Sequence, residues 1–101
     1  DTLTFAINMT IGVPENELTR SLNIYPNPST GVFNILFDIA TRQEIEISVI
    51  DALGRTIENK SFSGQAGTIA HQIDLSHQAR GLYFVRIKAG ENAVIEKITK
   101  M

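Results

Sequence analysis

The chain has 101 residues, 43% of them hydrophobic and 20% charged, with a formal net charge of −2, which suits one globular domain with a modest core. Nine Lys and Arg residues against eleven Asp and Glu residues give no basic surface that would point to nucleic acid or anionic lipid as a partner. The absence of cysteine excludes disulfides and thiolate metal sites, and no apolar run reaches the roughly 18 residues needed to span a bilayer.

Residues 1–21 differ in character from the rest of the chain. Residues 3–9 alternate between apolar and polar side chains like a strand, whereas residues 12–21 are polar and without a consistent period, as in a linker. We expect residues 1–21 to be the remnant of an upstream domain and its linker, and residues 22–101 to form the domain itself.

Short segments with a period of two, rich in Ile, Val, Phe and Thr, follow. Residues 32–39 place four apolar side chains on one face, with Asn34 and Asp38 on the other and Leu36 as an exception. The four are Phe33, Ile35, Phe37 and Ile39. This pattern predicts a half-buried strand.

The same alternation recurs at residues 45–51, 69–75 and 83–89. Residues 54–62 and 93–100 are weaker strand candidates, because Lys60 and Glu96 interrupt their apolar sides, and they are candidates for edge strands. No long segment shows the apolar spacing of an amphipathic helix.

Turn signals separate these segments. Asp51 and Gly54 are placed for a tight hairpin, and residues 90–92 suit a second one closed in the same way. Residues 63–67 form a looser connection between glycines, and residues 76–81 a longer one. Seven short strands between residues 22 and 100 predict an all-β, immunoglobulin-like antiparallel sandwich.

Four segments, in order, carry a resemblance to a known family. They are residues 22–31 (LNIYPNPSTG), 50–55 (IDALGR), 74–87 (DLSHQARGLYFVRI) and 96–101 (EKITKM). Together they resemble the C-terminal sorting domains of the type IX secretion system of Bacteroidota, the Por secretion tail family. The residues that the resemblance assigns to the sorting motifs are Tyr25, Pro26, Asn27, Pro28, Gly31, Asp51, Gly54, Gly81, Tyr83, Lys97 and Lys100.

The resemblance implies a sorting signal and not an enzyme. Such a domain directs a larger cargo protein, fused upstream, through the periplasm and across the outer membrane to the cell surface or the medium. The implied partners are the outer-membrane secretion machinery and a sortase-like peptidase that removes the domain. Cleavage is expected within the flexible segment Gly12, Val13, Pro14, Glu15, Asn16, Glu17, Leu18, Thr19, Arg20 and Ser21.

The motif residues also have structural interpretations. Pro26 and Pro28 predict a stiff, non-helical approach to the first long strand. Gly81 suits a position that needs positive φ or a close approach, and Tyr83 can bury its ring while its hydroxyl reaches a partner. None of these roles is catalytic.

Candidate chemical groups do not form a convincing site. His71 alternates with apolar residues, which favours a partly buried structural imidazole, and His77 lies in a predicted loop. Alternation places Asp38, Glu46 and Asp74 on solvent faces. We therefore expect no catalytic, metal or cofactor site and no small-molecule substrate.

A binding surface is the remaining expectation. Phe84, Leu36 and Leu82 are the apolar residues expected to face outward, and residues 82–100 include an edge strand that could pair with a partner or, weakly, with a second copy. Lys97 and Lys100 would protect that edge or contact the machinery. The alternative function is an accessory sandwich that binds carbohydrate or spaces a secreted enzyme, although the chain has no Trp for stacking on sugars.

Overall fold

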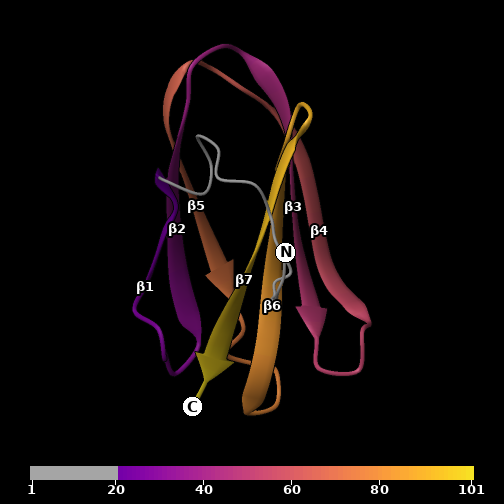
Figure 1. Ribbon diagram of the computed structural model, residues 1–101. Helices are drawn as coiled ribbons and strands as arrows, with labels where there is room; N and C mark the ends of the chain where they lie inside the picture. Colours follow the sequence, from indigo (N-terminus) through magenta and orange to yellow (C-terminus); the bar gives the residue numbers. More distant parts are fainter. Residues whose placement is uncertain (1–20) are drawn as a thin grey trace, which may run out of the picture.

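The computed structural model describes residues 21–101, which contain seven strands (Figure 1). They are β1 (Asn23–Tyr25), β2 (Val32–Ile39), β3 (Gln43–Asp51), β4 (Thr56–Gly64), β5 (Gly67–Asp74), β6 (Gly81–Ala89) and β7 (Asn92–Lys100). The seven strands predicted between residues 22 and 100 are therefore confirmed. The alternation at residues 3–9 lies outside the described residues.

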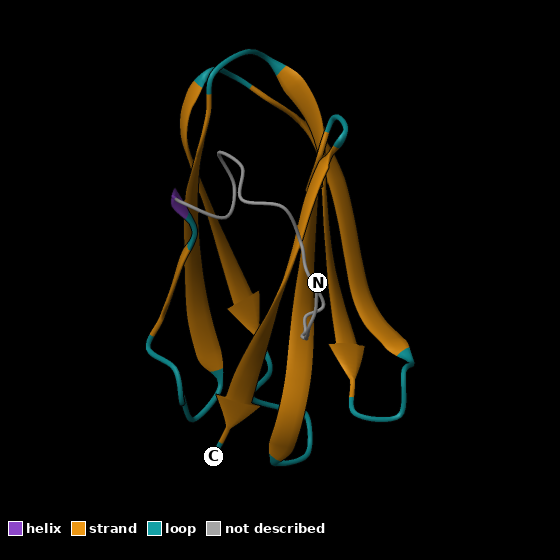
Figure 2. Cartoon of the chain, viewed as in Figure 1, coloured by secondary structure: helices purple, strands orange, loops and turns teal. Residues whose placement is uncertain are grey.

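The strands form two sheets that face each other (Figures 1 and 2). One has the order β1-β2-β5 and the other the order β4-β3-β6-β7, and neighbouring strands are antiparallel. The first, second and fifth strands oppose the third, sixth and seventh, as in immunoglobulin-like sandwiches. The all-β sandwich prediction is confirmed.

The core consists of alternate residues that point between the two sheets. In β2 the buried residues are Phe33, Ile35, Phe37 and Ile39, as the alternation predicts. β3 contributes Ile45, Ile47 and Val49, β5 Ile69 and Ile73, β6 Tyr83, Val85, Ile87 and Ala89, and β7 Val94 and Ile98, with Leu75 following β5. Because the chain has no cysteine, these two apolar inner faces hold the sheets together without a disulfide between them.

The connections differ in part from those expected. Gly54 ends the β3–β4 hairpin with φ +89°, but in the β6–β7 hairpin the glycine comes first, Gly90 with φ +60°. The two hairpins are therefore closed differently. The connection expected to be loose at residues 63–67 is short, because β4 runs to Gly64 and β5 starts at Gly67.

The two weaker strand candidates are confirmed as edges. β4 and β7 lie at opposite ends of the four-stranded sheet. β4 alternates poorly because most of its side chains are exposed, and in β7 Glu96 occupies a position of the inner side yet is exposed. An edge strand tolerates such residues because it has a neighbour on one side only.

We predict that Phe33→Ala lowers the free energy of unfolding by about 3–5 kcal/mol, since it leaves a cavity the size of a phenyl ring in the core. Val32→Ala, at the exposed neighbouring position, should cost less than about 1 kcal/mol. Urea unfolding followed by circular dichroism measures both. Equal losses in the two variants would contradict the assignment of the inner face of β2.

Candidate functional site

The four motif segments meet at one end of the sandwich, although they are far apart in the sequence. Asp51 of β3 pairs with Tyr83 of β6, and Gly81 of β6 pairs with Lys100 of β7. Lys100 is also bridged to Ser29. The order across this end is therefore the β3–β4 turn, the start of β6, the end of β7 and the segment before β2 (Figure 1). We call it the motif end.

Residues 27–29 pair with the end of β7. The Asn27 side-chain amide donates to the Lys97 carbonyl (3.1 Å), and its oxygen accepts from the Thr99 amide (3.0 Å). The Ser29 amide donates to the Thr99 carbonyl (3.1 Å), and the Ser29 carbonyl accepts from the Met101 amide (2.8 Å). The Asn27 side chain thus acts as a peptide group would in a neighbouring strand.

The two prolines in this segment have the predicted non-helical surroundings. β1 ends at Tyr25, and residues 26–28 belong to no strand. The peptide bonds preceding Pro26 and Pro28 are both cis. Asn27, between the two prolines, lies at the edge of β7.

Ser29 is a site residue that the sequence reasoning missed. Its side chain is buried, accepts from the Gly31 amide (3.1 Å) and donates to the Val32 carbonyl (2.6 Å). Gly31 in turn lies so close to Ser76 that an added Cβ would be 2.9 Å from the Ser76 Cα. These contacts require a small polar residue and a glycine in this order; the only signal for the serine in the sequence is its place in a turn-like run.

Asp51 organises the β3–β4 turn, as predicted. Its Oδ1 accepts from the Leu53 and Arg55 amides (2.9 Å each), and its Oδ2 pairs with Arg55 Nε (2.7 Å). The hydrogen bond from the Arg55 amide has the largest effect, and together with the other donors it holds the pKa of Asp51 below its ordinary value. A carboxylate is therefore the form that the turn requires.

Tyr83 fixes the loop that leads into β6. Its ring is buried and its hydroxyl donates to the Ala79 carbonyl (2.5 Å), the arrangement called a tyrosine corner in immunoglobulin-like domains. Gly81 has φ +144° with open space around it, so its backbone conformation, and not a close approach, favours glycine. Ser76 at the start of this loop is held by the Asp74 carboxylate, whose pKa is lowered by the hydrogen bond from the Ser76 hydroxyl.

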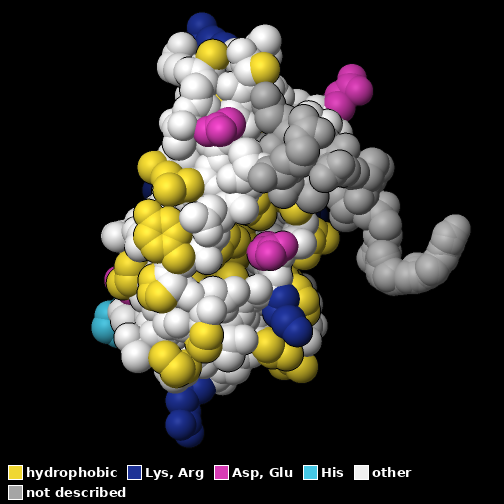
Figure 3. Space-filling view, turned by 60° about the vertical axis from the view of Figure 1, so that its left-hand side comes forward, with side chains coloured by type: hydrophobic (Ala, Val, Ile, Leu, Met, Phe, Trp, Pro, Cys, Tyr) yellow, Lys and Arg dark blue, Asp and Glu magenta, His cyan; other side chains and the backbone are white. Residues whose placement is uncertain are grey.

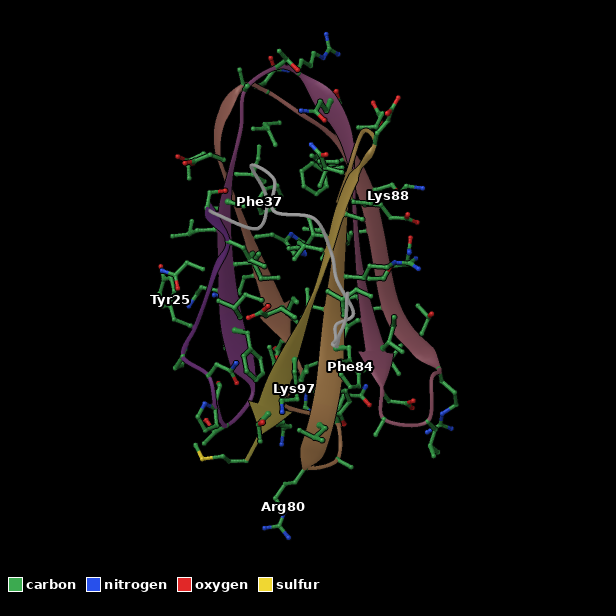
Figure 4. All side chains as sticks on the ribbon, viewed as in Figure 1. Tyr25, Phe37, Arg80, Phe84, Lys88 and Lys97 are labelled. Atoms are coloured by element: carbon green, nitrogen blue, oxygen red, sulfur yellow. The ribbon has the colours of Figure 1, made fainter. Side chains whose placement is uncertain are left out.

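The two lysines of the last motif have different environments. Lys97 is exposed on β7, as Figure 4 shows. Lys100 is only 9% exposed, and its Nζ donates to the Met101 carbonyl (3.4 Å). The prediction that Lys100 protects an open edge is wrong, because the alternation of β7 turns it inward after Ile98 and its backbone is bridged to Ser29.

Around these buried groups, the motif end exposes apolar side chains. A shallow pocket of about 180 Å³ lies between residues 51–55 and residues 79–83. Leu53 (80% exposed) and Leu82 (44% exposed) line it together with Arg80, which Figure 4 shows extending away from the sandwich. Of the apolar residues expected to face outward, Leu82 is exposed, whereas Phe84 and Leu36 are half-buried.

Titratable groups are dispersed. His71 is partly buried as predicted: it stacks on Phe62 with ring centroids 6.1 Å apart, and burial lowers its pKa. His77 is exposed. Within residues 21–101, no group of three or more His, Asp or Glu side chains could hold a metal ion, and no helix there is long and apolar enough to cross a membrane.

The segment expected to be cleaved falls mostly on residues 12–20, outside the described residues. Its last member, Ser21, is described: the Ser21 hydroxyl accepts from the Asp38 amide of β2 (3.0 Å). Ser21 is thus attached to the sandwich.

Residues 23–101 match a family model described as "Secretion system C-terminal sorting domain". The matched span starts at the first residue of β1 and includes all seven strands and the motif end. No curated protein matches the chain.

We predict that Asn27→Ala speeds hydrogen exchange of the Thr99 amide about fivefold, since that amide loses its acceptor and a hydrogen bond contributes about 1 kcal/mol. The Ile98 residue faces Tyr83 in the β6–β7 pair, so its exchange should change little. Asn23→Ala, at an exposed position of β1, is the matched control. Unchanged exchange at Thr99 would show that Asn27 does not close this edge.

We predict that Asp51→Asn lowers stability at neutral pH and that this difference disappears in acid. Because the pKa of Asp51 is lowered by folding, its charge stabilises the fold above the pKa of the unfolded chain, about 3.9, and the benefit is lost as the pH falls through the folded value. Urea unfolding between pH 7 and pH 2.5 or so measures this. Glu91→Gln, in the β6–β7 hairpin, controls for net charge and should show a smaller effect; equal effects would contradict the role of Asp51.

Proposed function

The chain belongs to the family of secretion system C-terminal sorting domains, and we propose that the secretion machinery recognises it at the motif end. The domain directs secretion of a cargo protein across the outer membrane through the type IX secretion system. The family is one of sorting signals and not of catalysts. The sorting role predicted from the sequence is thereby confirmed; the surface that is recognised is our proposal.

The exposed apolar side chains of the motif end support this proposal. Within residues 21–101, the large hydrophobic residues with exposed side chains are Tyr25, Val32, Leu53, Leu82, Ile95 and Met101. Val32, Leu53, Leu82 and Met101 flank the turns and strand ends that make up the motif end. Leu53 and Leu82 line the shallow pocket together with Arg80. Exposed apolar side chains that lie together mark interaction sites, and arginine is enriched in protein interfaces.

The motif residues divide into two roles in this proposal. Asp51, Ser29 and Tyr83 direct their polar atoms into the domain's own backbone, so they position the turns and do not themselves meet a partner. Leu53 and Leu82 are left to make the contact. The machinery would then recognise a shape that the buried motif residues hold in place.

We place the boundary of the sorting domain at residue 22, with the cargo fused upstream. The route we propose runs through the periplasm to the outer membrane, and from there to the cell surface or the medium. A sortase-like peptidase would then cut within residues 12–21. Attachment of the Ser21 hydroxyl to β2 favours a bond upstream of Ser21, because a peptidase needs an extended chain that is free of the sandwich. The amino-terminal sequence of the released domain would identify that bond.

The test uses a reporter fused ahead of residues 1–101 in a bacterium with a type IX system. We predict that Leu53→Asp combined with Leu82→Asp lowers the reporter at the cell surface at least about tenfold, since two charges oppose burial of the apolar surface. Both side chains are exposed, so the melting temperature should change little. Surface labelling of the reporter and thermal unfolding of the purified variant are the measurements.

Ala66→Asp is the matched control. Ala66 is exposed in the β4–β5 connection, at the opposite end of the sandwich (Figure 1), and this variant should be exported normally. Equal export of the double variant and the wild type would refute recognition at the motif end. If the reporter reached the surface equally well without residues 22–101, the sorting role in this chain would itself be wrong.

A further inference from the structure

β7 has one edge that does not pair with β6, and residues 27–29 cover only its last part, from Lys97 to Met101. The backbone of Thr99 and the carbonyl of Lys97 point away from β6, because they bond with Asn27 and Ser29. In an antiparallel pair, residues bond alternately to the neighbour on either side. Lys97, Ile95 and Ala93 therefore turn their backbone groups to the same free edge as Thr99.

From Lys97 back to Ala93, this edge of β7 has no neighbouring strand within residues 21–101. Neither the backbone bonds outside the sheets nor the side-chain hydrogen bonds of this part of the chain involve Ala93 or Ile95. The N–H and C=O groups of Ala93 and Ile95 and the N–H of Lys97 thus form a row of unpaired donors and acceptors. Such a row is the template to which an extended chain adds as a further strand.

The side chains around this edge are suited to a partner. Ile95 is 52% exposed, and it is the one exposed large hydrophobic residue that lies on β7 itself. Glu96 is exposed although it occupies an inward position of the strand, so the sandwich is open between β7 and β1 at this level. Figure 3, turned so that the side bearing β1 comes forward, shows apolar side chains gathered there with charged ones beside them.

The other edge of the same sheet is protected. On β4, Asn59 donates to Glu46 and Ser48 of β3, and the Ser63 hydroxyl accepts from Arg42. The side chains of this strand are mostly polar and exposed, which discourages the addition of a strand. Along residues 93–97 of β7, Glu96 and Lys97 are the only charged side chains that would discourage the addition of a strand.

We propose that Ala93 to Lys97 bind an extended segment of a partner polypeptide, which adds to the four-stranded sheet as a fifth strand. The inference rests on the proposed function, in which the partner is a protein of the secretion machinery. About five residues, or about 17 Å of extended chain, would pair with this edge. On the outer face, the segment would carry an apolar side chain opposite Ile95 and an acidic one opposite Lys97, which is exposed and has no ion pair within residues 21–101. The intervening side chains, on the other face, would be apolar and cover the opening toward β1.

The test replaces the outward N–H groups with proline. Ala93→Pro and Ile95→Pro each remove one donor from the free edge and leave the bonds to β6 in place, since proline is tolerated where the N–H of an edge strand faces away from the sheet. Ser61→Pro is the control. The strand registers pair Ser61 of β4 with Glu46 of β3, Glu46 with Lys88 of β6, and Lys88 with Ala93 of β7. Because backbone groups alternate in direction across such a row, the Ser61 amide points away from the sheet at its other edge, as the Ala93 amide does. The reporter fused ahead of the full chain measures export, and thermal unfolding verifies that each variant is folded.

The expected result is at least about a tenfold loss of surface reporter for folded Ala93→Pro and Ile95→Pro, with normal export of Ser61→Pro. Normal export of both β7 variants, while export still requires the domain, would overturn this inference and leave the proposed function intact. If a proline unfolds the sandwich, Ile95→Asp, which changes an exposed side chain, decides: reduced export supports the proposal and normal export overturns it.

A cross-linking experiment identifies the occupant of the edge. Because the chain has no cysteine, Ile95→Cys and the control Ser61→Cys each carry one unique thiol for a thiol-specific photo-cross-linker in exporting cells. The proposal requires an adduct at position 95, absent at position 61, whose mass corresponds to the fusion plus one protein of the secretion machinery. An adduct with a second copy, or a cross-link confined to the fusion itself, would overturn it.

Discussion

Pairing between residues 27–29 and the end of β7 is the interaction on which the arrangement of the motifs depends. It joins positions 70 and 72 residues apart through the side chain of Asn27. It also connects the two sheets at one edge, since β1 and β2 belong to one sheet and β7 to the other. Without it, the segment before β2 would be held at this end only by Gly31, whose carbonyl accepts from the Leu75 amide (2.7 Å) and which packs on Ser76.

The motif residues differ in chemistry because each of them fixes a different turn or strand end. Asp51, Tyr83 and Asn27 each complete a hydrogen bond to the domain's own backbone, while Gly31 provides room for Ser76. None of these groups is arranged for bond-making or bond-breaking. They fix the local geometry of the turns and strand ends, and two of them, Asp51 and Tyr83, hold the segments that carry Leu53 and Leu82.

The sequence predicts β2, β3, β5 and β6 well because each of these strands has one buried face, so its pattern is local. Residues 32–39 match β2 in full, and Lys60 and Glu96 correctly mark the two edges of the larger sheet. The convergence of the motifs could not be predicted in this way, since hydrogen bonds across 70 residues leave no periodic signal. The burial of Lys100 could have been predicted, because Lys100 lies two residues after Ile98 and therefore on the same, buried face of β7. The prediction of exposure gave more weight to the usual place of lysine on an edge strand.

The topology of the motif end has a consequence for timing. Contacts between residues 27–29 and residues 97–101 close one of the longest loops in the chain, and such long-range contacts are expected late in folding because of their entropic cost. A receptor that binds the motif end finds the four segments assembled only after the sandwich is complete. Recognition of this composite surface would therefore act as proofreading: an unfinished or misfolded chain would lack the signal, and its cargo would stay behind.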